Sequence, residues 1–230
     1  MVSSILHGEA MKRRVAILIS GRGSNMVALI EAAKAKNFPA EIVVVISNRA
    51  DAGGLAKASE AGVATLTIES KPFGKERAAF EAALQSALDL HKVELICLGG
   101  FMRLLTAEFV RRWYGRMLNI HPSLLPSFPG LEPQAQALAA GVKISGATVH
   151  FVIPETDAGP ILMQGAVAVR DDDTAETLAA RILEIEHRIY PDALRLLASG
   201  KVRLEGDIGK IDGGDAASGD SLISPEVTQK

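Results

Sequence analysis

Three short and nearly continuous runs of apolar residues constrain most strongly what this chain can fold into. They are Arg14–Ser20 (RVAILIS), Glu41–Ser47 (EIVVVIS) and Val93–Gly99 (VELICLG), rich in β-branched residues and followed by turn residues. Such runs are typical of strands that are covered on both faces, as in a parallel sheet. Helix-like segments lie between them, at Met26–Ala33 and Gly74–Leu90. Strand and helix in alternation predict right-handed βαβ units.

The second half of the chain adds further candidate elements. We expect strands at Met117–Ile120, Ala147–Val152, Ile161–Val169 and Val202–Leu204, and helices at Gln134–Ala140 and Thr174–Leu197. The long helix carries an apolar stripe that would pack on the sheet. The predicted fold class is α/β, with a mostly parallel central sheet and helices on both faces.

The length and the residue composition along the chain predict one folded domain with an extra segment at each terminus. A chain of 230 residues suits a single domain with a sizeable core. We expect residues 13–204 to form that domain, after an N-terminal extension over 1–12 in which Met11 is as good a natural start as Met1. Residues 205–230 are rich in Gly, Asp and Ser, and are expected to be a disordered tail.

Charge and hydropathy narrow the class of partner. The formal net charge of −2 offers no basic field for nucleic acid or an anionic membrane, so a small molecule is the expected partner. No run approaches the roughly 20 apolar residues that span a bilayer. The first residues lack the apolar core of a secretory signal, which predicts a cytoplasmic location. The single cysteine, Cys97, lies in an apolar run and is expected to be a buried core residue.

The first βα turn, Ile19–Met26 (ISGRGSNM), has the texture of an anion site. Its glycines let the backbone bend closely, and Ser24 and Asn25 open a helix whose free N–H groups favour an anion. A dinucleotide fingerprint needs a third glycine where Met26 stands, so a loop for a single phosphate fits better. A tight turn with a Ser or Asn cap explains the same residues without any ligand.

Chemistry-bearing residues also follow the later strands. The loop Gly99–Thr106 (GGFMRLLT) could wall a flat apolar ligand, or its apolar residues could be core. Asn119 and His121 stand two apart at a strand end, so their side chains share one face, before a loop that Pro122, Pro126 and Pro129 restrict. A histidine satisfied by a local hydrogen bond is the competing interpretation.

The segment His150–Pro160 (HFVIPETDAGP) places two carboxylates, Glu155 and Asp157, after another strand. A carboxylate beside an imidazole favours the charged ring. Spacing alone does not say which carboxylate reaches the cleft, and acidic residues in a turn are often merely solvated.

Five segments together closely resemble the glycinamide ribonucleotide formyltransferase family. They are GRGSN (21–25), GFMRLLT (100–106), MLNIHPSLLPSFPG (117–130), GATVHFVIPETDAGPIL (146–162) and EIEHRIYP (184–191). The resemblance covers residues 13–204. It implies a Rossmann-like formyltransferase fold and transfer of a formyl group from 10-formyltetrahydrofolate to the amino group of glycinamide ribonucleotide in purine synthesis.

The resemblance also implies roles for individual residues. Asn119, His121 and Asp157 correspond to the family's catalytic residues, with Asn119 and Asp157 also beside the folate. Gly23, Ser24, Asn25 and Glu186 correspond to the ribonucleotide site, and His150 to a supporting residue. The folate would contact Arg77, Met102, Arg103, Leu104 and Leu105. No metal is implied, the partners are the two small-molecule substrates, and the chain is expected to be a monomer or homodimer.

One segment departs from the family pattern. Pro129–Gln136 (PGLEPQAQ) carries Glu132, Pro133 and Gln134 where many members keep histidines. This puts the substrate contacts of that loop in question and leaves the three catalytic candidates intact.

Three alternatives compete with this function. A formyltetrahydrofolate hydrolase is expected to carry an extra N-terminal domain, and a methionyl-tRNA formyltransferase a basic C-terminal domain; the sequence given suggests neither. A binding module that kept the fold and lost catalysis is favoured only by the altered Glu132–Gln134 segment. The intact Asn119, His121 and Asp157 argue against it.

Overall fold

The computed structural model describes residues 11–206 and 208–212. Its elements follow one another as β1 (Arg13–Ile19), α1 (Ser24–Ala33), β2 (Ala40–Ser47), α2 (Gly54–Glu60), β3 (Thr65–Thr67), α3 (Arg77–Leu90), β4 (Leu95–Leu98), α4 (Ala107–Arg112), β5 (Met117–His121), α5 (Pro133–Ala139), β6 (Ile144–Phe151), β7 (Ile161–Ala168), α6 (Ala175–Ala198), β8 (Val202–Glu205) and β9 (Ile208–Ile211). Each predicted strand and helix overlaps an observed element, and residues 1–10 of the predicted extension over 1–12 lie outside the described residues.

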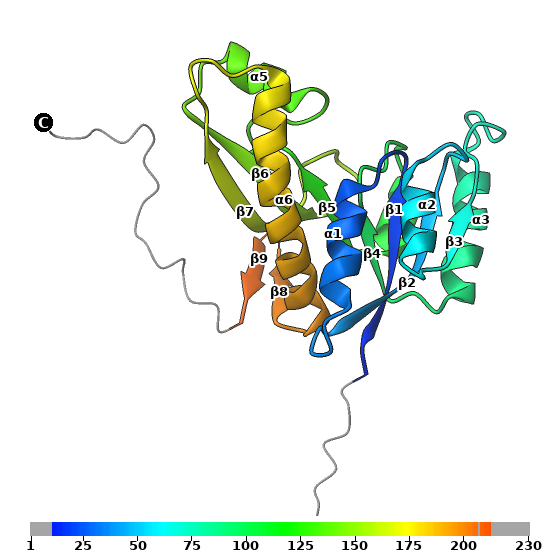
Figure 1. Cartoon of the computed structure of the whole chain (residues 1–230). Coiled ribbons are helices and arrows are strands. Elements are labelled where there is room, and N and C mark those ends of the chain that lie inside the picture. The colour runs from blue at the N-terminus through cyan, green and yellow to red at the C-terminus, as the bar shows by residue number, and fades with distance from the viewer. Residues whose placement is uncertain (1–10, 207, 213–230) are drawn as a thin grey trace, which may run out of the picture.

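Seven strands form one sheet in the order β3-β2-β1-β4-β5-β6-β7 (Figure 1). The pairs from β3 to β5 are all parallel, whereas β6 runs antiparallel to β5, and β7 antiparallel to β6. The predicted α/β fold with a mostly parallel sheet is confirmed.

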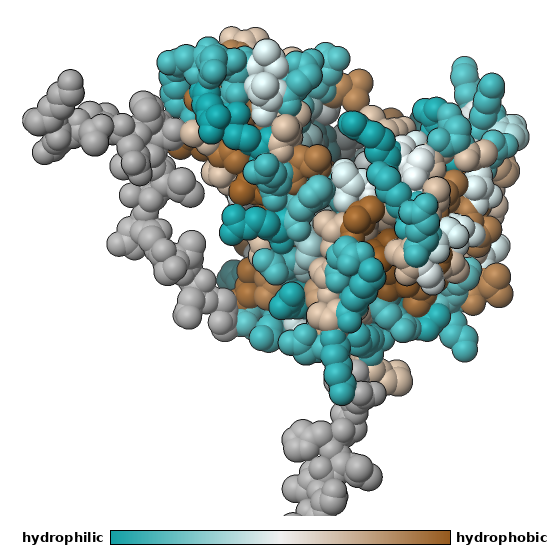
Figure 2. All heavy atoms as spheres, viewed as in Figure 1, coloured by the Kyte–Doolittle hydropathy of each residue, from teal (hydrophilic) through white to brown (hydrophobic). Residues whose placement is uncertain are grey.

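Strand β1 shows why its run of apolar residues is continuous. Val15, Ile17 and Ile19 pack into one core with α1 and α6, while Ala16 and Leu18 pack into another with α3 and α4. Each face of the strand is therefore buried under helices, as the sequence predicted. Hydrophilic side chains cover much of the outer surface in the view of Figure 2, with apolar patches between them.

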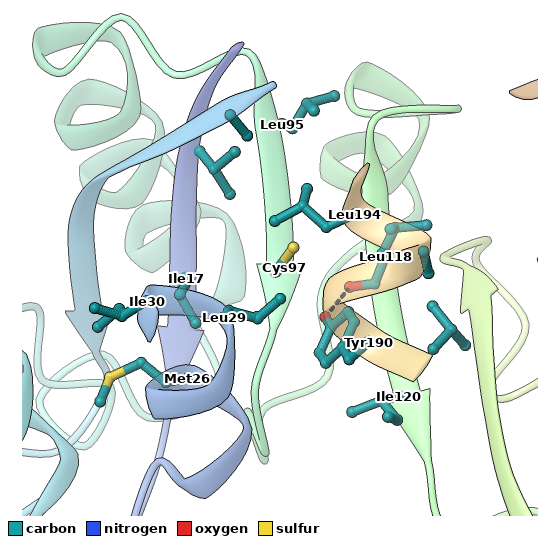
Figure 3. Close-up of a cluster of buried hydrophobic side chains, with 14 of the residues drawn as sticks. Ile17, Met26, Leu29, Ile30, Leu95, Cys97, Leu118, Ile120, Tyr190 and Leu194 are labelled. Atoms are coloured by element: carbon teal, nitrogen blue, oxygen red, sulfur yellow. Dashed lines mark hydrogen bonds between the residues drawn. The ribbon is translucent and has the colours of Figure 1, made fainter. Parts of the chain in front are cut away.

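Helix α6 is tied to the centre of the sheet by a buried tyrosine. The hydroxyl of Tyr190 lies 3.1 Å from the carbonyl oxygen of Leu118 near the start of β5 (Figure 3), and 3.0 Å from that of Leu98, the last residue of β4. Cys97 lies in the same core, fully buried as predicted, and burial raises the pKa of its thiol to about 12. The long predicted helix begins at a capping box formed by Thr174 and Thr177.

Some short elements were not predicted from the sequence. Strand β3 has three residues and helix α4 has six, too few for an apolar period to stand out. Helix α2 and strand β9 were also not predicted.

The C-terminal boundary of the fold moves beyond residue 204. Strands β8 and β9 form a separate two-stranded sheet, with Val202 paired to Ile211 and Glu205 to Ile208. The first residues of the predicted tail are therefore a hairpin strand that packs beside Ile161, because a Cβ on Gly209 would lie 2.8 Å from the carbonyl oxygen of Ile161. Residues 213–230 of that predicted tail lie outside the described part. No helix among residues 11–206 and 208–212 is long and apolar enough to cross a membrane.

Candidate active site

The end of β5 supplies two polar side chains to one side of the sheet. Leu118 and Ile120 pack into the core under α6 (Figure 3). Asn119 and His121 alternate with them along the strand and therefore point to the opposite face. His121 is buried, with 6% of its surface exposed. The following loop is held by Thr148 on β6, whose hydroxyl donates to the carbonyl of Ser123 and accepts from the amide of Leu125. Fixing the loop fixes the strand end that carries the histidine.

Strand β6 brings a second histidine to Asn119. Asn119 and His150 are directly paired across the two strands, and Asn119 Nδ2 lies 3.1 Å from His150 Nε2. The other ring nitrogen of His150 donates to the carbonyl oxygen of Phe151 at 2.9 Å. His150 Nε2 therefore accepts from the Asn119 amide in the neutral ring. Burial lowers the pKa of His150, which favours that neutral form.

The loop between β6 and β7 delivers the carboxylate. Asp157 adopts a left-handed backbone conformation with φ 54°, and its side chain turns toward both histidines. Two residues on, a Cβ at Gly159 would lie 1.8 Å from the carbonyl oxygen of Phe151, so only glycine fits there. The Asp-x-Gly segment thus folds the loop back onto β6. Both carboxylates left open by spacing line the cleft, but Glu155 is exposed, and Asp157 is the one that lies within 4 Å of the histidine rings.

His121 has one nitrogen committed and one facing the carboxylate. Its Nε2 lies 2.9 Å from the carbonyl oxygen of Phe128, which only accepts, so Nε2 carries a proton. Its Nδ1 lies 3.5 Å from Asp157 Oδ2, and Asp157 Oδ1 lies 3.9 Å from His150 Nε2. The three predicted residues are therefore brought together, and His150 completes the group.

A cleft opens beside this group. Its polar side is formed by Asn119, His150 and Asp157, and its apolar side includes Leu98, Phe101, Leu104 and Leu105. We call residues Gly100–Thr106 the wall loop.

Not every predicted folate contact reaches this cleft. Arg103 lines it, and the guanidinium also lies 4.8 Å from the ring centre of Phe80. Met102 is 71% exposed and does not line the cleft, and Arg77 is exposed at the first turn of α3. The sequence analysis considered only the carboxylates of the segment His150–Pro160, and did not predict that residues 152–156 form another wall of the cleft. Their position directly after a predicted strand was the available signal.

The glycine-rich turn after β1 packs against the start of α2. Gly23 caps α1 in a left-handed conformation with φ 67°, and no side chain caps the helix. The amide of Gly54 donates to the carbonyl of Gly21 at 3.0 Å, and a Cβ on Gly54 would lie 2.6 Å from Ile19 Cδ1. The first turn of α1 has no acidic residue, so its N–H groups suit an anion.

A buried carboxylate meets this turn from α6. Asn25 Nδ2 donates to Glu186 Oε2 at 2.6 Å, and both side chains are buried. Burial raises the pKa of Glu186, and the Asn25 hydrogen bond partly offsets this. Within the described residues, Asn25 Oδ1 is buried with no hydrogen-bond partner, as expected of an acceptor that a ligand would satisfy.

The segment that differs from the family pattern, Pro129–Gln136, leads into helix α5. Glu132 is exposed with φ 52° and precedes Pro133 at the first turn, where a missing N–H costs nothing. Gln136 Nε2 donates to the carbonyl of Leu131 at 2.8 Å, and the amide of Gly130 donates to Asp157 Oδ2 at 2.8 Å. The loop is therefore held by the candidate catalytic carboxylate.

Across residues 11–206 and 208–212, no group of three or more His, Cys, Asp or Glu side chains is arranged to hold a metal ion.

Comparison with known proteins agrees with this geometry. The model of the formyl transferase family matches residues 13–194. The phosphoribosylglycinamide formyltransferase of Escherichia coli K12 is 40% identical over 199 residues, which are 86% of this chain and 93% of that protein. The crystal structure of glycinamide ribonucleotide transformylase 1 from Symbiobacterium toebii superposes with a TM-score of 0.86 at 46% identity, covering 91% of this chain and 98% of that one.

A longer relative shares the same region. The trifunctional purine biosynthetic protein adenosine-3 of Bos taurus is 52% identical over 203 residues, 88% of this chain. This chain spans only 20% of the length of that protein. Family match, full-length relative and solved structure together give the conclusion that the chain belongs to the formyl transferase family, among the phosphoribosylglycinamide formyltransferases.

Proposed function

We propose that this chain transfers the formyl group of 10-formyltetrahydrofolate to the amino group of glycinamide ribonucleotide, giving formylglycinamide ribonucleotide and tetrahydrofolate in purine synthesis. The observation that carries the proposal is the meeting of Asn119, His150 and Asp157 at the polar side of an apolar cleft, with His121 buried directly behind Asp157. A flat pterin suits the apolar side, and a formyl group would then lie toward the polar one.

The ribonucleotide is assigned to the turn after β1. Its phosphate would accept hydrogen bonds from the first N–H groups of α1, at Ser24 and Asn25, with Gly23 allowing close approach. Glu186 would accept from the sugar hydroxyls or the glycinamide, and Asn25 Oδ1 would gain a donor. This places the amine between the phosphate site and the cleft.

The reaction needs a stabilised oxyanion and a proton path. The neutral amine attacks the formyl carbon, a C–N bond forms, and the carbonyl electrons move to oxygen. The free N–H of Asn119 and the Nδ1–H of His121 as imidazolium would donate to that oxygen. The oxyanion electrons then re-form the carbonyl as the C–N10 bond breaks, its electron pair goes to N10 of the folate, and N10 takes the proton that the attacking amine gives up, with Asp157 holding the charged ring. This group is the catalytic assignment, with His150 orienting Asn119.

The proposal includes the remaining contacts to the folate. Arg103, Leu104 and Leu105 are assigned to the folate with Asn119 and Asp157, while Arg77 and Met102 would need to approach a bound folate from the rim of the cleft. No metal takes part in the proposed reaction, and a cytoplasmic location and a monomer or homodimer remain predictions.

The test is an assay of the purified chain with glycinamide ribonucleotide and 10-formyltetrahydrofolate, following tetrahydrofolate formation. His121→Ala should lower turnover by about 10²- to 10⁴-fold, the range of acid-base catalysis. Near-wild-type turnover in this variant would remove His121 from the mechanism. Binding of both ligands without formyl transfer in the wild type would favour a binding module instead.

A further inference from the structure

The wall loop lies beside the cleft with little backbone support of its own, although Phe101 and Leu105 pack against the core and Arg103 Nη2 donates to the carbonyl of Gly74 at 3.2 Å. Two of its apolar side chains are largely exposed, Met102 at 71% and Leu104 at 63%. In the described part of the chain, the backbone amides of Phe101 and of residues 103–105 make no hydrogen bond. Something outside the loop must therefore keep it in place beside the cleft.

The first anchor is Ser20, the last residue before the glycine turn. Its hydroxyl accepts from the amide of Met102 at 2.8 Å and donates to Asn48 Oδ1 at 2.6 Å. Its own amide donates to the carbonyl of Gly100 at 3.2 Å. Ser20 and Asn48 are 7% and 8% exposed, so water does not readily replace these bonds.

Asn48 is itself fixed by its surroundings. Its Nδ2 donates to Ser70 Oγ at 3.0 Å, and the amide of Ser70 donates to the carbonyl of Asn48 at 3.1 Å. The Ser20 hydroxyl thus connects the wall loop to the ends of β1 and β2 with its donor and acceptor both used.

The second anchor holds the far end of the wall loop. Glu81 on α3 is 5% exposed, and its carboxylate accepts from the amide of Thr106 at 2.6 Å and from the Thr106 hydroxyl. Thr106 Oγ1 also accepts from the amide of Phe109 and caps α4. The anchor therefore connects two helices through the last residue of the loop.

We propose that Ser20 and Glu81, which do not touch the cleft, are positioning residues that clamp the two ends of the wall loop and so set the affinity for the folate cosubstrate. The proposal rests on the proposed function for the identity of that ligand. The clamp itself is a property of the unliganded chain, because all of its bonds lie within the protein.

The clamp should act on one substrate more than on the other. The glycine turn that is assigned to the ribonucleotide is held by contacts that do not involve the Ser20 hydroxyl. The amide of Gly54 donates to the carbonyl of Gly21, and Gly54 packs against Gly23. Loss of the Ser20 hydroxyl frees Met102 but leaves these contacts in place. Folate binding should therefore weaken while ribonucleotide binding changes little.

The experiment compares Ser20→Ala with the matched control Ser145→Ala. Ser145 is also a buried serine, 3% exposed, and in the described part its hydroxyl has no hydrogen-bond partner. Glu81→Ala is compared with Glu81→Gln, which keeps an oxygen that accepts from the Thr106 amide. Ser20→Thr keeps the hydroxyl and should restore the wild-type behaviour.

The first readout is hydrogen exchange of the unliganded proteins over residues 100–106. Ser20→Ala and Glu81→Ala should speed exchange there by about tenfold or more, as loss of a buried hydrogen bond implies, and the controls should not. Unchanged exchange in Ser20→Ala would overturn the clamp. This readout needs no substrate and is decided even if the chain proves to have no formyltransferase activity.

The second readout is kinetic. In Ser20→Ala, KM for 10-formyltetrahydrofolate should rise by about tenfold, and KM for glycinamide ribonucleotide should stay within about twofold. A direct titration with tetrahydrofolate should show the same loss of affinity. Equal increases for both substrates, or no change in either, would overturn the assignment of the clamp to the folate site.

Discussion

Asn119 donates its side-chain amide to Nε2 of His150 across 3.1 Å, between residues that are directly paired on β5 and β6. Since the other nitrogen of His150 donates to the carbonyl of Phe151, only the neutral ring accepts this bond. The histidine that the sequence marked as supporting thus orients the amide that would face the formyl oxygen.

Replacing His150 tests this orientation directly. His150→Phe keeps a ring but removes the acceptor, so Asn119 loses its fixed direction and kcat should fall by about five- to a hundredfold, the cost of a buried unpaired donor. His150→Gln keeps an acceptor oxygen and should recover part of the loss. Single-turnover formyl transfer measures both. Equal rates in the two variants would contradict an orienting role.

The same histidine should make stability fall in mild acid. Burial lowers the folded-state pKa of His150 below its ordinary value of 6.5, so the unfolded chain takes up the proton first as pH falls. The contribution is complete above about pH 7 and is lost as pH falls through 6.5 toward the folded pKa, at no more than about 1.4 kcal/mol per pH unit. In urea unfolding between pH 7.5 and 5, His150→Gln should lose less stability than the wild type. The pKa of His187 is lowered too, but His187 is present in both proteins. Parallel curves for the two proteins would refute the prediction.

Asp157 has two roles that substitutions can separate: its charge lies beside the histidines, and its oxygen holds the loop at Gly130. Asp157→Asn removes the charge near His121 and His150 but keeps an oxygen for the amide of Gly130, so turnover should fall by about 10²-fold or more without loosening the loop. Asp157→Ala should additionally speed hydrogen exchange at Gly130. Turnover and exchange are measured on both variants. Wild-type turnover in Asp157→Asn would leave the carboxylate with a purely structural role.

The Glu186 carboxylate should lower the free energy of unfolding and favour binding of glycinamide ribonucleotide. Its folded-state pKa is raised above the ordinary 4.5 by burial, so the folded chain loses stability as pH rises through that folded pKa. Glu186→Gln removes this cost and still accepts from Asn25. The variant should be more stable than the wild type at pH 8, with a difference that shrinks toward pH 4.5, while KM for glycinamide ribonucleotide rises by about tenfold. Thermal unfolding at several pH values and steady-state kinetics check the two effects, and a less stable variant at pH 8 would refute the first.

The sequence predicted the long helices and strands and the kinds of side chain in the candidate site. It did not predict which side chains contact one another. A run such as Arg14–Ser20 can be predicted as a buried strand from its composition, because a strand that is covered on both faces is apolar at nearly every position. The short elements α2, β3 and α4 were not recognised, because three to seven residues carry little periodic pattern, although α5 and β8, which are as short, were predicted. The strand pair Asn119 and His150 is 31 residues apart in the chain, so no local pattern predicts it.

By itself the sequence determined the fold class, the family and the presence of Asn119, His121 and Asp157, because strand burial and motif order are written in local residue types. Only the tertiary structure decided that Asp157 rather than Glu155 faces the histidines, that His150 accepts from Asn119, and that Ser20 and Glu81 hold the wall loop. The physical reason is that hydrogen bonds are directional and short. Which donor meets which acceptor is settled by the register of the sheet and the packing of the loops, and these depend on contacts between residues far apart in the chain.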